Sequence, residues 1–197
     1  MKTSVSVNLI ATPEQLSHLE ALQKAFARLC NELAPEVQKT RVWNRVVMHH
    51  MFYKHLREKF PDVGSQMVCN AIYAVSKTSR ILFQISDSPF YVDKLGKNAL
   101  PLMEFQNNCP VFFDRHTLSL NGNILSLFTL NGRIKFDIQK DNKDSNFEML
   151  NNIQEIFLIK GEFYYELKFI YKINVFDKKL NKFKMPDYLR VERKNDK

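Results

Sequence analysis

The sequence of 197 residues is poor in glycine and cysteine, and it has no long apolar run. Its 5 Gly stand singly, so neither a P-loop nor a dinucleotide-binding fingerprint is present. Its three cysteines, Cys30, Cys69 and Cys109, are too far apart for a CxxC metal knuckle. No segment approaches the ~18 apolar residues of a membrane-spanning helix. We therefore expect a cytoplasmic protein whose thiols are reduced and mostly buried.

Patterns that support catalysis are also absent. The histidines His49, His50 and His55 fall in one stretch but have no HExxH spacing. Asp177 follows an apolar run, but no second acid lies in a comparable setting for two-metal chemistry. The sequence predicts no catalytic residue, no metal site and no cofactor.

Basic residues gather in the first and last parts of this chain, whose net charge is +8. Residues 1–80 hold 11 Lys and Arg against 6 Asp and Glu, and residues 160–197 again hold 11 against 6. Residues 81–159, between them, hold 7 against 9. Two basic segments around a nearly neutral middle suggest a polyanion bound across two elements, although many soluble basic proteins bind no nucleic acid.

The clearest structural signal lies in residues 111–138, where two Asn-Gly pairs separate runs rich in Ile, Leu, Phe and Thr. Asn121-Gly122 and Asn131-Gly132 favour hairpin turns, because these residue types tolerate positive φ angles. After the second turn, apolar and polar residues alternate as in a half-buried strand. The segment predicts three antiparallel strands.

A strand and three helices are predicted before this segment. Residues 2–10 alternate between apolar and polar. Thr12, Pro13 and Gln15 then form a capping-box start for a helix that runs to about residue 33, where Pro35 marks the end. The second helix is expected over residues 38–60 and the third over residues 64–79, each with an apolar stripe.

The rest of the chain is less regular. Residues 81–85 could extend the third helix or form a short strand. Further strands are predicted over residues 153–159 and 162–175, with a polar loop at residues 141–146. Residues 177–197 are highly charged and poor in apolar residues, which predicts a flexible, exposed basic tail.

The basic residues of the second helix are the best candidate site. Arg41 and Arg45 are four apart, and Lys54 and Arg57 are three apart, so each pair is expected to share a helix face that could contact phosphates. A solvated face with no ligand is the alternative. Further cations fall on the hairpins. The full candidate set for nucleic-acid binding is Lys39, Arg41, Arg45, Lys54, Arg57, Lys59, Lys77, Arg80, Arg115, His116, Arg133 and Lys135.

The order of elements resembles the N-terminal half of the TnpB family, transposon-encoded RNA-guided nucleases related to compact type V CRISPR effectors. The resemblance rests on short motifs in matching order over about residues 3–170. They are Thr12, Pro13 and Gln15 at a helix start; Asn31 near that helix's end; Leu56, Arg57, Phe60 and Pro61 at the next helix end; Ser65-Gln66; and Leu127, Thr129, Leu130, Gly132 and Arg133 in late strands.

The resemblance implies an α+β fold. Residues 1–11 and 81–176 would form a wedge-like antiparallel β-barrel, and residues 12–80 a three-helix recognition domain inserted after the first strand. In the family these modules hold the guide-RNA scaffold and the guide–target heteroduplex, while base pairing reads the sequence. By resemblance, the partners would be a structured, guide-type RNA and an RNA-guided DNA target.

The family continues into a RuvC-like nuclease domain with three catalytic acids and usually a CxxC zinc ribbon, and both are missing from this sequence. We therefore expect a nuclease-lacking RNA-binding protein and no enzyme. Two alternatives stay open. One is the non-catalytic subunit of a split nuclease, docked through the 163–176 strand to a separate RuvC chain. The other is a decoy that inhibits an intact relative by taking its RNA or replacing a second copy in a dimer. A decaying transposon remnant is also consistent with the sequence.

Overall fold

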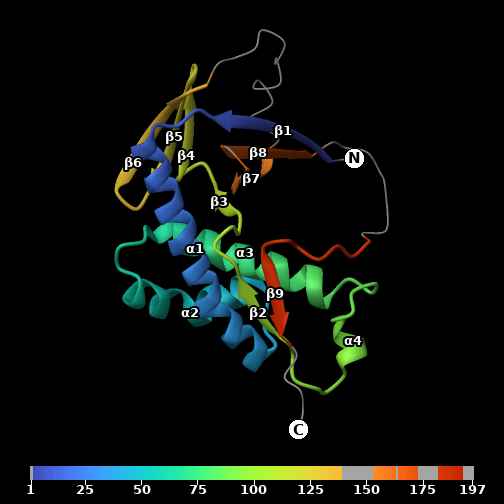
Figure 1. Cartoon of the computed structure of the whole chain (residues 1–197). Coiled ribbons are helices and arrows are strands. Elements are labelled where there is room, and N and C mark those ends of the chain that lie inside the picture. Colours follow the sequence, from blue (N-terminus) through green and yellow to red (C-terminus); the bar gives the residue numbers. More distant parts are fainter. Residues whose placement is uncertain (1, 139–152, 163, 173–181, 193–197) are drawn as a thin grey trace. The chain divides into compact units, whose positions relative to one another are not determined.

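A computed structural model of the whole chain describes residues 2–138, 153–162, 164–172 and 182–192. These residues form helices and strands in which every strand pairing is antiparallel, so the fold class is α+β (Figure 1). The loop predicted at residues 141–146 lies outside the described residues. Contacts divide the chain into unit 1, residues 1–23 and 110–178, and unit 2, residues 24–109 and 179–197. Residues 12–23 thus belong to unit 1 and residues 81–109 to unit 2, whereas the predicted domains were divided at residues 11 and 80.

Unit 1 contains a four-stranded sheet in the order β1-β8-β7-β3. The strands are β1 (Lys2–Leu9), β8 (Tyr165–Lys172), β7 (Ile153–Lys160) and β3 (Val111–Phe113). Cross-strand partners lie on the same side of a sheet, and Leu9 opposite Tyr165 and Leu158 opposite Leu167 are all buried. The strands predicted near residues 2–10 and 153–159 are confirmed, and the strand predicted over residues 162–175 is confirmed from Tyr165, because Glu162 and Tyr164 lie in bends before β8.

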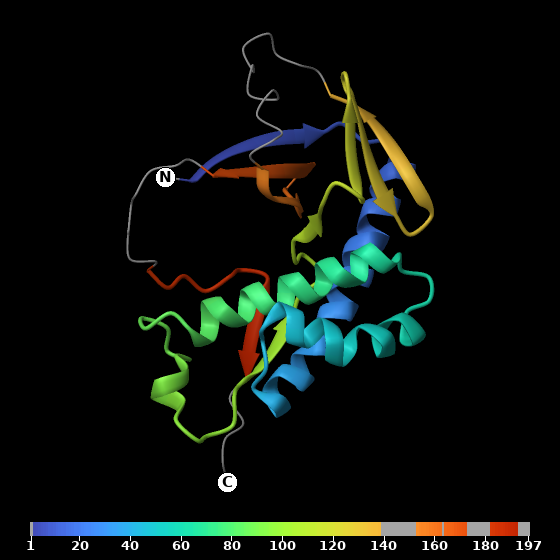
Figure 2. The ribbon, with the colours of Figure 1, turned by 180° about the vertical axis from the view of Figure 1, so that it is seen from behind.

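The Asn-Gly hairpins form a second sheet in unit 1, in the order β4-β5-β6 (Figure 2). Its strands are β4 (Leu118–Asn121), β5 (Ile124–Thr129) and β6 (Gly132–Asp137). The positive φ angles fall on the glycines, 59° at Gly122 and 96° at Gly132, where no Cβ opposes them. Leu125, Leu127 and Phe136 are buried on one side of this sheet. The three predicted hairpin strands are therefore confirmed, while residues 111–113 of the same segment form β3 in the other sheet.

The first helix, α1 (Pro13–Thr40), begins at the predicted capping box. The Gln15 amide donates to Thr12 Oγ1 at 3.2 Å, and the Thr12 amide donates to Gln15 Oε1 at 2.9 Å. The predicted end at Pro35 is wrong, because the helix continues to Thr40. Pro35 is exposed, while Val37 is fully buried in unit 2. Burial on the core side of this last stretch outweighs the one main-chain hydrogen bond that a proline removes.

Unit 2 contains α2 (Arg45–Lys59), α3 (Ser65–Phe83) and the short α4 (Val92–Leu95), with α2 and α3 side by side in both views (Figures 1 and 2). The predicted start of the second helix at residue 38 is wrong. Asn44 caps α2 instead, its side-chain oxygen accepting from the amides of Val46 and Val47 at 3.0 and 3.2 Å. The third helix continues past residue 79, so residues 81–83 extend it.

Unit 2 also contains a two-stranded sheet, β2 (Leu102–Phe105) paired with β9 (Leu189–Glu192). The prediction of a flexible, exposed tail over residues 177–197 is therefore wrong for β9. Leu189 is buried, and the main-chain oxygen of Tyr188 accepts from the amide of Gln106 at 2.9 Å. Strand β9 is held by its pairing with β2, and the Tyr188 ring beside it stacks on Phe105 with ring centres 6.4 Å apart.

The strand pairings of the described residues form three separate sheets and do not close into one barrel. In the same part of the chain, no helix combines the length and the apolar character needed to cross a membrane.

Candidate nucleic-acid interface

The three hairpin strands of unit 1 have one apolar side and one polar side. Strand register places Ser119 opposite Ser126, Ser126 opposite Lys135, and Phe128 opposite Arg133. Because directly opposed residues share a side of the sheet, the polar side is set by these pairs. We call it the hairpin face; it consists of Ser119, Asn121, Ile124, Ser126, Phe128, Arg133, Lys135 and Asp137.

Arg133 is the fixed cation of the hairpin face. Its Nη2 donates to the main-chain oxygen of His116 at 2.7 Å, and its Nη1 lies 3.4 Å from the main-chain oxygen of Ser126. The side chain nonetheless remains exposed. A guanidinium has five N–H donors, so these contacts orient it and leave donors free for an external anion.

A turn before β4 holds Arg115 and His116 beside this face. The carboxylate of Asp114 accepts from the amides of His116 and Thr117 at 3.0 and 3.1 Å, as in an Asx turn. Arg115 Nε lies 3.4 Å from His116 Nε2, and both residues are exposed. The acid of this turn is thus engaged with the main chain, while its two basic neighbours face solvent.

Lys135 adds another cation on β6. Its main-chain oxygen accepts from Gln15 Nε2 at 2.9 Å, which fixes the strand to the start of α1 within unit 1. Its side chain is exposed and has no hydrogen bond or ion pair with any residue that the structure describes. The one acid on the hairpin face, Asp137, lies at the far end of β6 opposite Ile124.

The structure therefore places Arg133 and Lys135 on one side of the hairpin sheet, and Arg115 and His116 in the turn that Arg133 contacts. The half-buried ring of Phe128 lies on the same side of the sheet as Arg133. Cations around an aromatic ring on a sheet can bind backbone phosphates and an unpaired base together. This combination is what makes the hairpin face the candidate interface.

The predicted Arg41–Arg45 pair on one helix face is wrong. Arg41 lies before the cap of α2, with a φ angle of 56°, and its guanidinium donates to the main-chain oxygens of Gly96 and Asn98 at 2.9 Å each. Arg45 begins α2, and its guanidinium carbon lies 5.1 Å from the centre of the Tyr73 ring, a cation–π contact. Lys39, in the last turn of α1, is exposed.

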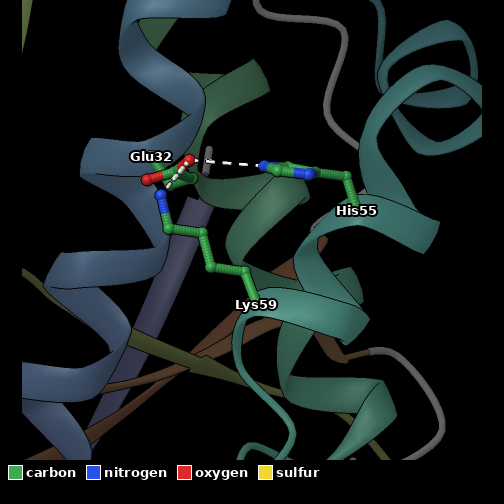
Figure 3. A network of polar contacts seen from close by, with 3 residues as sticks. All are labelled: Glu32, His55 and Lys59. Atoms are coloured by element: carbon green, nitrogen blue, oxygen red, sulfur yellow. Dashed lines mark hydrogen bonds and ion pairs between the residues drawn. The ribbon is translucent and has the colours of Figure 1, made fainter.

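The remaining predicted cations of α2 are partly engaged within unit 2. Lys59 Nζ lies 2.7 Å and His55 Nε2 3.4 Å from Glu32 Oε1, a network shown in Figure 3. The hydrogen bond from Lys59, followed by that from His55, lowers the pKa of Glu32. Arg57 donates to the main-chain oxygen of Val63. Lys54 is exposed and has no polar contact with the described residues.

Two predicted cations lie on α3. Arg80 is exposed, with its Nε 3.4 Å from the main-chain oxygen of Ser76, and Lys77 is half-buried. Neither of them lies on the hairpin face, which belongs to unit 1.

Sequence reasoning missed Lys97, which lies with Lys39 and Arg41 around one recess of unit 2. No local pattern in the sequence indicated the place of Lys97 beside Arg41.

Among the described residues, no three His, Cys, Asp or Glu side chains are grouped so that they could hold a metal ion. A scan against models of known protein families and a search of curated proteins both found no match for this chain. The resemblance to TnpB proteins therefore rests on the sequence motifs alone.

Proposed function

We propose that this chain is an RNA-binding protein that holds a structured RNA through the hairpin face and does not cut it. One observation supports this proposal most directly. Arg133 and Lys135 lie on one side of the hairpin sheet with Phe128, and Arg115 and His116 lie in the adjoining turn, where the carboxylate of Asp114 accepts from main-chain amides. Phosphate contacts of this kind make binding fall steeply with salt.

The origin of the chain is part of the same proposal. The motif order supports descent from the TnpB family, with the wedge-like barrel and inserted recognition domain as its finer architecture. In such proteins the bound RNA is guide-like, and an RNA-guided DNA target is a further ligand. The cysteines Cys30, Cys69 and Cys109 form no disulfide, which supports a reducing compartment such as the cytoplasm.

The motif residues also have structural explanations within each unit. Asn31, for example, binds both main-chain groups of Phe105, donating at 2.9 Å and accepting at 2.7 Å, and so anchors β2 to α1. Residues of this kind support a shared fold more than a shared reaction.

Purification of the protein from its native cells, followed by sequencing of the accompanying RNA, tests the proposed function. We expect a defined, structured RNA that is lost when the protein carries Arg115→Gln and Lys135→Gln. Recovery of no RNA, or of a random sample of cellular RNA, would contradict the proposal.

The same preparation distinguishes the alternative of a split nuclease. In that case, a separate RuvC-containing chain would co-purify and stay bound after ribonuclease treatment. The 163–176 strand is a poor dock for it, since β8 is paired on both edges and Tyr165, Leu167, Phe169 and Tyr171 are buried in unit 1.

A further inference from the structure

A basic recess lies in unit 2 between the end of α1 and the loop after α4. It has a volume of about 380 Å³. Its lining includes three cations and no carboxylate, and it consists of Gln38, Lys39, Arg41, Lys97, Asn98, Ala99 and Leu100. Three positive charges without an acid in the lining favour a multiply charged anion as ligand.

Arg41 is held in an unusual conformation at this recess. Its φ angle of 56° is the left-handed region, and among the described residues it is the one non-glycine residue with positive φ. Its amide still donates to the main-chain oxygen of Val37 at 2.9 Å, so it ends α1 at a position where glycine is usual. Strained residues of this kind are concentrated at functional sites.

Hydrogen bonds to the loop compensate for this strain and fix the recess. The Arg41 guanidinium donates to the main-chain oxygens of Gly96 and Asn98 at 2.9 Å each, on either side of Lys97. Gln38 Nε2 donates to the main-chain oxygen of Leu100 at 2.8 Å. Three bonds from the helix end thus set the loop, and Arg41 retains unused N–H donors.

Lys39 and Lys97 provide the other charges. Both side chains are exposed, and neither has a hydrogen bond or ion pair with a residue in the described part of the chain. Lys39 lies at the end of α1 and Lys97 on the anchored loop, so both side chains line the same recess as the Arg41 guanidinium.

We propose that this recess binds the terminal phosphomonoester of a nucleic acid, an inference that rests on the proposed RNA-binding function. A phosphate monoester has a charge of about −1.5 to −2 at neutral pH and three acceptor oxygens. An internal phosphodiester has a single charge and is flanked by two sugars, so it enters a recess less readily than a chain end does. The three cations of the recess complement the higher negative charge of a terminal phosphomonoester.

Fluorescence anisotropy with one RNA in three forms tests the inference. The forms have a 5′-phosphate, a 3′-phosphate or no terminal phosphate. We expect one phosphorylated form to bind about tenfold more tightly than the unphosphorylated form, the size of one strong charged hydrogen bond. The form that binds more tightly identifies the end.

The variant Lys39→Gln/Lys97→Gln should abolish this difference, while its affinity for unphosphorylated RNA should fall no more than that of the matched control, which also loses two cations. The matched control, Lys24→Gln/Arg28→Gln, removes two exposed cations of α1 outside the recess and should keep the difference. Equal binding of all three RNA forms, or disappearance of the difference in the control, would overturn the inference while the RNA-binding function stands.

If no RNA binds, the proposed function fails, and the recess is then tested by itself with a nucleoside 5′-monophosphate. Trp43, the one tryptophan of the sequence, follows Arg41 by two residues and packs on Phe83 with ring centres 5.4 Å apart. A saturable change in its fluorescence that is absent in Lys39→Gln/Lys97→Gln supports an anion site. A fluorescence trace with no saturable change overturns it.

Discussion

Arg133 Nη2 donates a hydrogen bond of 2.7 Å to the main-chain oxygen of His116, joining β6 to the turn that precedes β4. The bond crosses the hairpin sheet within unit 1 and fixes the guanidinium over Ser126. A lysine has neither the planar fork nor the reach to hold two main-chain oxygens in this way. We therefore expect RNA binding to depend on the fixed position of the Arg133 guanidinium as well as on its charge.

The variant Arg133→Lys tests this point, because it keeps the charge and removes the fixed geometry. We expect the affinity for RNA to fall about tenfold, as for one charged hydrogen bond. Filter binding at constant salt measures it. The control, Lys135→Arg, changes a side chain with no polar contact to the described residues and should stay within about twofold of wild type. Wild-type affinity in Arg133→Lys would remove Arg133 from the interface.

The capping box at the start of α1 should contribute to the free energy of unfolding. Thr12→Ala removes the oxygen that accepts from the Gln15 amide at 3.2 Å. We expect a decrease of about 1 kcal/mol in the free energy of unfolding. Urea denaturation measures the decrease, with the exposed Ser17→Ala on the same helix as control. A decrease as small as that of the control would mean that the cap contributes nothing to stability.

The ion pair of Glu32 in unit 2 makes a pH-dependent contribution to the free energy of unfolding. Lys59 lowers the pKa of Glu32 below the ordinary 4.5, so the contribution is complete above that value and disappears as the pH falls through the lower, folded-state pKa. Since both partners are partly exposed, we expect Glu32→Gln to cost only about 0.5 kcal/mol at pH 7. Urea denaturation at pH 7, 5 and 3 should show the difference from wild type decrease as the pH falls below 4.5.

Glu36→Gln is the matched control, one helical turn along α1 and without an ion pair to a described residue. It should differ little from wild type at every pH. A constant difference for Glu32→Gln down to pH 3 would mean that its cost has no electrostatic origin.

For Tyr188 we expect the reverse pH dependence, with stability lost as the pH rises. Burial raises its pKa to about 12, while the ordinary value is 10.0. Between these values the unfolded chain loses a proton that the folded chain keeps, so wild type becomes less stable as the pH rises from 10 to 12. Tyr188→Phe should remove up to about 2 kcal/mol of that decrease in stability, measured by denaturation at both pH values. The exposed Tyr164→Phe should leave the decrease unchanged.

The parts of the fold that could be predicted are those with local causes. The Asn-Gly turns and the capping box of Thr12 and Gln15 act over a few residues, and both were found as expected. The end of α1 could not be predicted in this way, because the burial of Val37 in the core outweighs Pro35. Strand β9 pairs with β2 across more than eighty residues, so no local signal indicated it.

The same distinction applies to the sites. Arg133 and His116 were both found as candidates because each lies at or beside a predicted hairpin, and the folded hairpins bring them into contact. Arg41 was misplaced on a helix because its left-handed turn depends on the distant loop of Gly96 and Asn98. Lys97 was missed for the same reason, since its place beside Arg41 arises only in the folded unit.

The salt dependence of RNA binding shows whether the hairpin face contacts phosphates. Wild type, Arg115→Gln/Lys135→Gln and the control Lys24→Gln/Arg28→Gln are compared by plotting the logarithm of the binding constant against that of the salt concentration. If the hairpin face binds phosphates, the slope of the first double variant should be shallower than wild type by about 0.7 to 0.9 for each phosphate that the variant no longer binds. The control should keep the wild-type slope. A wild-type slope in Arg115→Gln/Lys135→Gln would mean that the hairpin face does not bind RNA phosphates.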